Sequence, residues 1–218
     1  MKDMKTNNED AELICVKHPV VDRDLTILRN KHTDTKTFRR VMDRISIILA
    51  YYALKHLQLK EVKVETPITE TIGYEIDSHV IVVPILRAGL GLVDSIIRFI
   101  PDAKVGHLGM YRDPDTKQPV DYYSKLPSGL DTGYALVVDP MLATGGSACD
   151  ALHFLKKNGA KNITFMCLIA APEGIQKVRL EHPDVRIITA SIDEKLNEDA
   201  YIVPGLGDAG DRIFGTDH

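Results

Sequence analysis

The chain has 218 residues, 44% of them hydrophobic, so it can bury the core of one ordinary domain. Its net charge of -4 comes without a long basic run, which excludes the charge pattern typical of nucleic-acid binding, and no uncharged stretch reaches the roughly 20 residues of a membrane-spanning helix. Three scattered cysteines (Cys15, Cys149 and Cys167) argue against both a disulfide framework and a structural zinc site. We expect one soluble, cytoplasmic domain over residues 1–218, with no membrane or nucleic-acid partner.

The polar, acidic beginning of the chain predicts a loose N-terminal arm over residues 1–16. After it, apolar residues recur every three or four positions, which predicts an amphipathic helix that packs on a sheet. These positions are Phe38, Val41, Met42, Ile45, Ile48, Leu49, Tyr52 and Ala53.

Short runs rich in β-branched residues predict strands at 80–86, 104–111, 134–139, 163–170 and 185–190. Four of the five runs are largely continuous apolar, which is typical of strands buried on both faces. Helical patterns lie between several of them, at 90–99, 147–157 and 173–181. The alternation predicts an α/β fold, with a doubly wound, mainly parallel sheet flanked by helices. The segment 113–133 has three prolines and breaks this rhythm, so we expect a flap or hairpin there.

The sequence "YALVVDPMLATGGSACDAL" begins with a buried strand and places Asp139 at its carboxyl end, where ligands bind in such sheets. The following "ATGGS" lets backbone N–H groups and a helix N-terminus approach an anion. The loop lacks the lysine of GxxxxGK[ST], which argues against a nucleotide-hydrolysing P-loop. Because a carboxylate repels phosphate, Asp139 is better suited to accept hydrogen bonds from the hydroxyls of a ribose. The alternative is a plain helix start capped by Ser147.

The stretch "VVDPMLATGGSA" resembles the motif that binds 5-phosphoribosyl 1-diphosphate (PRPP) in type I phosphoribosyltransferases, and the chain is similar to the uracil branch of that family. The similarity extends through "PILRAGLGLVDSI", "VGHLGMYRDPDT", "AAPEGI" and "LNEDAYIVPGLGDAGDRIFGT", and covers nearly everything after residue 17. It implies the type I fold with a C-terminal hood over the base. It also implies transfer of a phosphoribosyl group from PRPP to N1 of uracil.

The resemblance assigns PRPP to twelve residues: Arg87, Arg112, Asp139, Pro140, Met141, Leu142, Ala143, Thr144, Gly145, Gly146, Ser147 and Asp208. Most of the superfamily has two adjacent acidic residues where this chain has Asp139 and Pro140, so one carboxylate remains for the ribose. Arg87 ends an apolar strand and is suited to clamp a diphosphate, although it could instead form a structural ion pair. Arg112 stands at the entry of the expected flap. Lys125, near its end, receives no role.

The C-terminal "YIVPGLGDAGDRIFGT" contains GxGxxG, but only eight residues follow Gly210, which is too few for a dinucleotide-binding unit. Its glycines predict an irregular loop whose backbone groups can face a small planar molecule. The resemblance assigns uracil to Ile202, Gly207, Asp208 and Ala209. It gives catalytic roles to Arg112 and Asp208.

The resemblance further implies Mg²⁺ delivered with PRPP, a GTP effector, and a homo-oligomer, either a dimer or a tetramer. We interpret Asp193, Glu194 and Glu198 as a solvated acidic turn, and the eight histidines as surface or satisfied groups rather than metal ligands. Two rivals stay open. One is an RNA-binding regulator on the same fold, and the other is an enzyme for another base such as orotate.

Overall fold

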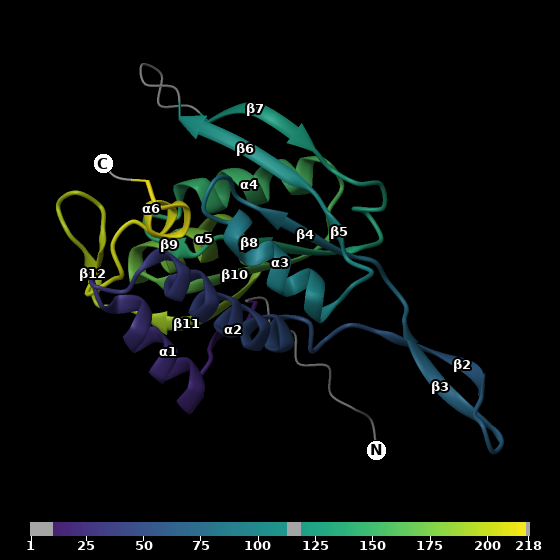
Figure 1. Ribbon diagram of the computed structural model, residues 1–218. Coiled ribbons are helices and arrows are strands. Elements are labelled where there is room, and N and C mark those ends of the chain that lie inside the picture. The colour runs from purple at the N-terminus through teal and green to yellow at the C-terminus, as the bar shows by residue number, and fades with distance from the viewer. Residues whose placement is uncertain (1–10, 113–118, 217–218) are drawn as a thin grey trace, which may run out of the picture.

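The computed structural model describes residues 11–112 and 119–216, without the side chains of residues 110–122. Its centre is a parallel sheet in which β9 (Met141–Leu142) extends the pairing of β8 with β10 (Figure 1). The order of the other strands is β1 (Leu13–Cys15), β11 (Arg186–Ile192), β10 (Asn162–Ala170), β8 (Tyr134–Val138), β4 (Val80–Pro84) and β5 (Lys104–Val105). The predicted fold class is confirmed.

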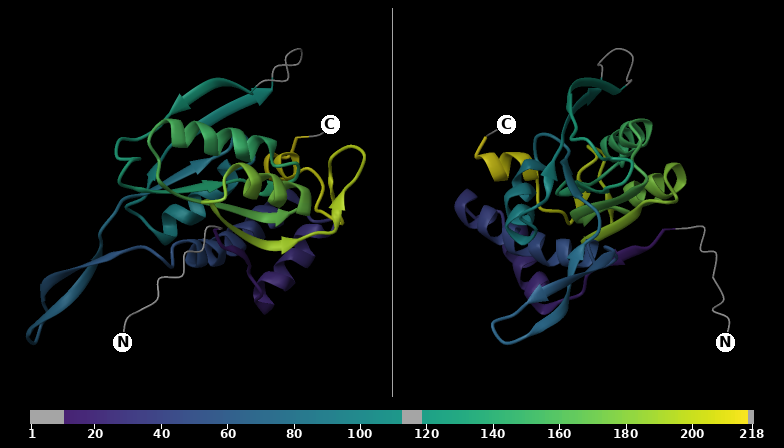
Figure 2. Two further views of the ribbon diagram at one scale, coloured as in Figure 1. Left: turned by 180° about the vertical axis from the view of Figure 1, so that it is seen from behind. Right: turned by 90° about the vertical axis from the view of Figure 1, so that its right-hand side faces the viewer.

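The central strands are buried on both faces, so successive residues feed two separate cores. Val82 and Leu136 face one core, whereas Val83 and Val137 face the other. Helices α1 (Pro19–Arg29), α2 (Thr35–Ala53) and α3 (Leu90–Phe99) pack on the first, and α4 (Gly146–Lys157) and α5 (Pro172–Glu181) pack on the second. Figure 2 shows these two helical layers on either side of the sheet.

Local sequence signals explain where α2 begins and which side it buries. Asp34 accepts a hydrogen bond from the Thr37 backbone N–H at 2.8 Å, which caps the first turn. The predicted apolar stripe is buried at Phe38, Ile45 and Leu49, so that prediction is confirmed.

The predicted loose arm over residues 1–16 is wrong at its end. Residues 13–15 form β1, which pairs in parallel with Ile187 to Thr189 of β11 and lies at one edge of the sheet. The backbone hydrogen bonds of this pairing hold residues 13–15 in the sheet. Residues 1–10 of the predicted arm lie outside the described residues.

The predicted strand at 104–111 is divided in two. Of this stretch, β5 pairs with β4, whereas β6 (His107–Arg112) keeps one parallel bridge, from Leu108 to Ile85 just after β4, and otherwise pairs antiparallel with β7 (Pro119–Lys125). The expected hairpin is therefore present but begins earlier than predicted, and residues 113–118 of the predicted flap lie outside the described residues. A second hairpin, β2 (Leu59–Glu65) with β3 (Glu70–Ile76), projects from the body (Figures 1 and 2).

The C-terminal part lies over the carboxyl edge of the sheet, at the left of Figure 1. It contains β12 (Lys195–Leu196), β13 (Ile202–Val203) and α6 (Ala209–Phe214). Among the described helices, none is both long and apolar enough to cross a membrane.

Candidate active site

Two adjoining cavities lie at the carboxyl edge of the sheet, and they share Asp139, Met141 and Ala143. The larger, of about 250 Å³, is also lined by Ala88, Ala200, Tyr201, Ile202, Gly207, Asp208, Ala209 and Gly210. The smaller, of about 90 Å³, is also lined by Leu142, Thr144, Gly145, Gly146, Ser147 and Ala148. The second set forms the anion loop predicted from the sequence, and the first contains the predicted base-binding residues. Asp139 stands where the two spaces meet.

Asp139 follows β8 directly, and hydrogen bonds hold both its backbone and its side chain. Its N–H donates to the Met166 carbonyl at 3.1 Å, and its Oδ1 accepts from the Met141 N–H at 3.3 Å. Burial among the loops raises the pKa of this carboxyl to about 7, and the hydrogen bond from Met141 lowers it only partly. A carboxylate with spare lone pairs in such surroundings is suited to accept hydrogen bonds from neutral hydroxyls.

The anion loop leads directly into α4. Gly145 is the N-cap residue with φ of 79°, and its helix start has no side-chain cap, so the alternative that Ser147 caps this helix is wrong. The first N–H groups of a helix lack intrahelical partners, which leaves them available to an anion. Ser147 lines this space, and Thr144 accepts from the Gly146 N–H at 3.4 Å.

The glycine at 145 serves conformation and packing more than anion access. A Cβ there would lie 2.9 Å from the Gly174 carbonyl oxygen of α5, on the side facing that helix. A substitution would therefore disturb the fold as well as the loop.

Pro140 lines neither cavity, but its carbonyl accepts from the N–H groups of Leu168 and Ile169, which fixes the loop to β10.

Arg87 lies in the loop after β4, and its side chain is 67% exposed. Its guanidinium is 3.9 Å from the Asp211 carboxylate of α6, which is a loose contact for an ion pair. The Leu86–Arg87 peptide bond is cis. An exposed guanidinium so weakly engaged remains able to reach a diphosphate.

The loop of Arg87 approaches the Asp139 loop closely because Gly89 has no side chain. A Cβ at Gly89 would lie 2.5 Å from the Val138 carbonyl and 2.7 Å from the Ile85 carbonyl. The neighbouring Ala88 lines the larger cavity. The sequence "RAG" therefore combines an exposed cation with the small residues that this approach requires.

The predicted uracil residues Ile202, Gly207, Asp208 and Ala209 all line the larger cavity. Gly207 has φ of 78°, and no backbone hydrogen bond within the described residues uses its N–H or its carbonyl. Asp208 caps α6 by accepting from the Asp211 N–H at 3.0 Å. The lining residue Ala200 was missed, because an alanine carries no chemical signal in the sequence.

Arg112 is the last residue of β6, and its side chain lies outside the described residues. Its assignment to PRPP stays a prediction. Lys125, at the end of β7, is described and exposed.

The interpretation of Asp193 as part of a solvated turn is wrong. Its side chain is 2% exposed and pairs with Arg29 of α1 at 2.6 Å. Asp193 also accepts from the Gly205 N–H at 2.9 Å, while Arg29 donates to the Gly205 carbonyl at 2.9 Å. Burial alone would raise the pKa of Asp193, but the hydrogen bonds from Arg29, Ser191 and Gly205 outweigh it and lower that pKa. The pair thus holds the loop that leads to the predicted base-binding residues.

The donor set around these cavities does not form a protein cage for Mg²⁺. Asp139 and Asp208 are the two carboxylates among the described lining residues, and Asp208 already caps α6. Mg²⁺ favours six oxygen ligands and keeps substrate oxygens and waters among them. The residues present therefore fit an ion that arrives bound to a polyphosphate.

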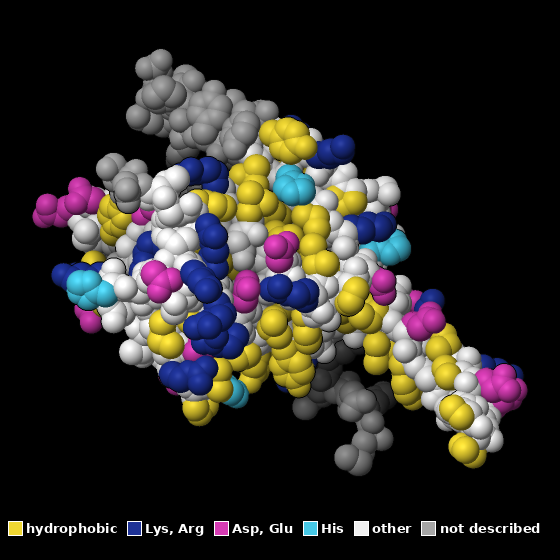
Figure 3. Space-filling view, viewed as in Figure 1, with side chains coloured by type: hydrophobic (Ala, Val, Ile, Leu, Met, Phe, Trp, Pro, Cys, Tyr) yellow, Lys and Arg dark blue, Asp and Glu magenta, His cyan; other side chains and the backbone are white. Residues whose placement is uncertain are grey.

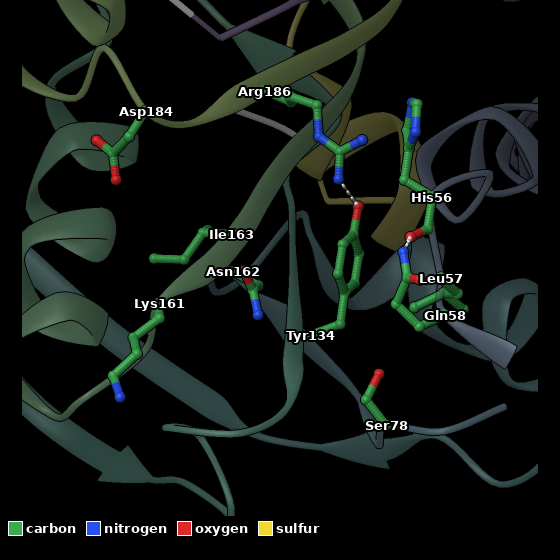
Figure 4. Close-up of a pocket in the computed structure, with 10 residues that line it drawn as sticks. All are labelled: His56, Leu57, Gln58, Ser78, Tyr134, Lys161, Asn162, Ile163, Asp184 and Arg186. Atoms are coloured by element: carbon green, nitrogen blue, oxygen red, sulfur yellow. Dashed lines mark hydrogen bonds between the residues drawn. The ribbon is translucent and has the colours of Figure 1, made fainter. Parts of the chain in front are cut away.

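A further cavity of about 260 Å³ lies at the opposite, amino edge of the sheet (Figure 4). Its wall includes Tyr134, whose hydroxyl accepts from Arg186 at 3.1 Å and also contacts the Ala53 carbonyl and the Thr164 hydroxyl. Tyr134 begins β8 and Asp139 follows its end, so about 16 Å of strand separates this cavity from the candidate site.

Comparison with known proteins gives a consistent result. The family model described as uracil phosphoribosyltransferase matches residues 15–216. The uracil phosphoribosyltransferase of Bacillus licheniformis is 58% identical over 200 residues, covering 91% of this chain and 96% of the relative. That of Salinibacter ruber is 55% identical over 201 residues, with coverage of 92% and 96%.

A solved structure of a protein from Aquifex aeolicus superposes with a TM-score of 0.88 at 34% identity. The superposition covers 94% of this chain and 99% of the other. The family match begins at Cys15, the last residue of β1, ends at residue 216, and includes the residues that line both cavities. The chain therefore belongs to the uracil phosphoribosyltransferase family.

Proposed function

We propose that this protein transfers the phosphoribosyl group of PRPP to N1 of uracil, giving UMP and diphosphate in pyrimidine salvage. The observation that carries the proposal is the pair of cavities joined at Asp139. The smaller cavity is bordered by a polar loop at a helix N-terminus, and the larger is lined mainly by backbone and apolar groups together with Asp139 and Asp208. Together they provide a place for a phosphate, a ribose and a flat base in that order.

In the reaction a bond forms between N1 of uracil and C1 of the ribose, the bond from C1 to the diphosphate oxygen breaks, and the N1 proton is released. The protein's part is to orient the reactants and to stabilise developing charge. The α4 N-terminus with Thr144 and Ser147 holds the 5-phosphate, and Asp139 accepts from the ribose hydroxyls. We assign Arg87 and Arg112 to the diphosphate, and Asp208 to both the base and PRPP.

We propose that PRPP brings Mg²⁺ with it; the bound ion would supply positive charge close to the departing diphosphate. Because Asp139 and Asp208 are the two described carboxylates that line the cavities, most ligands of the ion would be substrate oxygens and water. Omitting the ion while varying PRPP would measure this requirement.

Uracil presents an acceptor, a donor and an acceptor at O2, N3–H and O4, which backbone groups near Ile202 and at Gly207 to Ala209 can match. Arg212, the cation nearest in sequence, does not line the cavity. It donates to the carbonyls of Leu28, Leu206 and Asn30 and lies over the Phe38 ring. A guanidinium so engaged cannot also pair with the carboxylate of orotate, which favours uracil over that rival.

The proposal is tested by an assay with PRPP, Mg²⁺ and five bases: uracil, cytosine, orotate, hypoxanthine and adenine. We expect nucleotide product from uracil alone at a substantial rate. Product from orotate or a purine at a rate equal to that from uracil would overturn the assignment.

The RNA-binding rival receives one point of support from the surface. Figure 3 shows Lys and Arg side chains in a band over the face of α1 and α2. Several basic residues on α2 and the neighbouring α3 already form ion pairs or hydrogen bonds within the protein. Arg44 pairs with the buried Asp24, Arg39 donates to the Ile213 carbonyl, and Arg98 of α3 pairs with Asp43. We propose that the protein binds no nucleic acid. RNA retention that is measurable at low salt and falls steeply as salt rises would contradict this.

We also propose a homo-oligomer, with the β2–β3 hairpin as its contact. The hairpin exposes Leu59, Ile72, Tyr74 and Ile76 on one face, together with Ile68 at its tip, and an isolated two-stranded hairpin is marginally stable in water. Beside its base lies an apolar groove of about 340 Å³ formed with Tyr51, Leu54 and Phe99. A second copy could place its hairpin against this groove while receiving the first copy's hairpin in return.

A GTP effect on activity and a cytoplasmic location complete the proposal. The three cysteines are free, which suits a reducing compartment. Initial rates with and without GTP at subsaturating PRPP would test the effector.

A further inference from the structure

A cluster of metal-ligand types lies between the outer helices α4 and α5, and the reaction does not use it. Cys149 is in the first turns of α4, Glu181 is the last residue of α5, and His182 follows it. One potential ligand atom from each of the three lies within 4.8 Å of the others. Cys149 and His182 are buried, whereas the Glu181 side chain is 47% exposed.

We propose that Cys149, Glu181 and His182 bind a divalent ion of the zinc type. Thiolate, imidazole and carboxylate are the ligands that Zn²⁺ takes in proteins, at about 2.0–2.3 Å. Three ligands held about that far from one ion lie roughly 3.3–3.8 Å apart in a tetrahedron. The observed spacing therefore requires side-chain shifts of about an ångström, without movement of the helices.

The hydrogen bonding of His182 favours a ligand role. Its Nε2 lies 3.2 Å from the Cys149 backbone carbonyl, and because a carbonyl can only accept, Nε2 carries the proton. Nδ1 is then left with a lone pair. Histidines that bind metals usually donate their other N–H to a carbonyl or carboxylate in this way, which fixes the tautomer and the ring.

A fourth ligand is within reach on the same helix. His153 is one turn after Cys149, is exposed, and its ring centre lies 6.4 Å from that of His182. Rotation of its side chain toward Cys149 would complete a set of four; otherwise water takes the fourth position.

Charge and access also fit. A thiolate and a carboxylate together offset a double positive charge, and the exposed Glu181 gives the ion a path from solvent. Because zinc binds the thiolate rather than the thiol, uptake of metal at Cys149 should release a proton.

The proposed ion is separate from the Mg²⁺ of the reaction, which prefers oxygen ligands. The site is nevertheless close to the anion loop, because the Cys149 N–H donates to the Gly145 carbonyl at 2.9 Å. Metal there would join α4 and α5 one turn below the loop.

The test is titration of the reduced, chelator-treated full chain with Co²⁺, followed by electronic absorption. We expect one equivalent of Co²⁺ per chain, with a thiolate-to-cobalt charge-transfer band and the visible bands of tetrahedral cobalt, both abolished by Zn²⁺. Cys149→Ser should remove the charge-transfer band, whereas the matched variants Cys15→Ser and Cys167→Ser should keep it.

Because Cys149 is buried, its replacement could impair folding, so two further variants keep the test decisive. Glu181→Gln and His182→Gln should weaken Co²⁺ binding about tenfold or more. Exposed Glu181 is expected to tolerate its change without loss of folding. A charge-transfer band that survives in Cys149→Ser, no band with excess Co²⁺, or unchanged affinity in both glutamine variants would each overturn the proposal.

Discussion

Arg29 and Asp193 form a two-pronged ion pair beneath the C-terminal loop, with Nη1 2.7 Å from Oδ2 and Nη2 2.6 Å from Oδ1. The same two side chains hold both the N–H and the carbonyl of Gly205. Gly205 stands between Ile202 and Gly207, which line the proposed base pocket. The ion pair therefore holds the proposed base-binding loop, although neither of its two residues lines the proposed base pocket.

Replacing Asp193 by Asn should weaken uracil binding more than PRPP binding. The ion pair with Arg29 is lost, and the side chain at position 193 becomes a weaker acceptor for the Gly205 N–H. We therefore expect the free energy of unfolding in urea to fall by about 1–3 kcal/mol. The KM for uracil should rise several-fold while the KM for PRPP changes less.

Glu194→Gln is the matched control, because Glu194 is the exposed neighbour and bonds to Val203 only through its backbone. Since the pKa of Asp193 is lowered in the folded protein, the stabilisation from its charged form is present above the ordinary value of 3.8 and is lost as the pH falls below it. Equal effects of the two variants on uracil KM would refute a positioning role.

Asp139→Asn should stabilise the ligand-free protein at alkaline pH while removing activity. The pKa of Asp139 is raised from 3.8 to about 7, so the folded state favours the protonated form. Wild-type stability should fall as the pH rises from about 4 to about 7, an effect absent from the Asn variant. Above pH 7 we expect the variant to be more stable by about 1–4 kcal/mol.

Thermal or urea unfolding of both proteins across this pH range measures the difference. A constant gap between the two stability curves at every pH would show that the Asp139 carboxyl is not destabilised by burial. The accompanying loss of PRPP binding would identify a residue kept for function at a cost in stability.

Arg112→Ala should lower kcat more than it lowers uracil affinity, because the predicted role of this cation is to stabilise charge that grows as diphosphate leaves. Lys125→Ala is the control from the other strand of the hairpin. Comparable losses of kcat and of uracil affinity in the Arg112 variant would point to a structural role.

Ile72→Lys should shift the protein toward monomer in sedimentation equilibrium. Ile72 lies on the apolar face of the hairpin and is 58% exposed. Thr71→Lys adds the same charge one residue earlier, on the opposite face, and should leave assembly unchanged. A wild-type protein that is monomeric at micromolar concentration, or equal effects of both variants, would refute the hairpin as the contact.

Much of the fold could be predicted, because the buried strands carry continuous apolar runs and the helices carry a regular stripe. The helix predicted at 90–99 coincides with α3. The β2–β3 hairpin carried no prediction, since its residues are largely exposed on both faces and no buried side sets a pattern. The strand at 104–111 was misplaced because its composition could not show that β6 pairs mainly with β7 rather than with the sheet.

The candidate site was predicted where chemistry is local to one motif, as in the loop from Asp139 to Ser147. The Arg29–Asp193 pair could not be, because its partners are 164 residues apart and each looks like an ordinary surface charge. Ala200, too, becomes recognisable as a lining residue only when the C-terminal segment lies over the sheet.

The central claim, that backbone groups of the C-terminal loop read uracil, is tested most directly by comparing kcat/KM for uracil, 5-fluorouracil and cytosine at fixed PRPP. Cytosine reverses the hydrogen-bonding sense at two of the three edge positions, and backbone groups cannot rotate to compensate. Two unpaired polar groups at about 1–3 kcal/mol each should lower kcat/KM for cytosine by roughly 30-fold to more than 1,000-fold. 5-Fluorouracil keeps the same edge and should remain a substrate, whereas cytosine turnover within a few-fold of uracil would contradict the account.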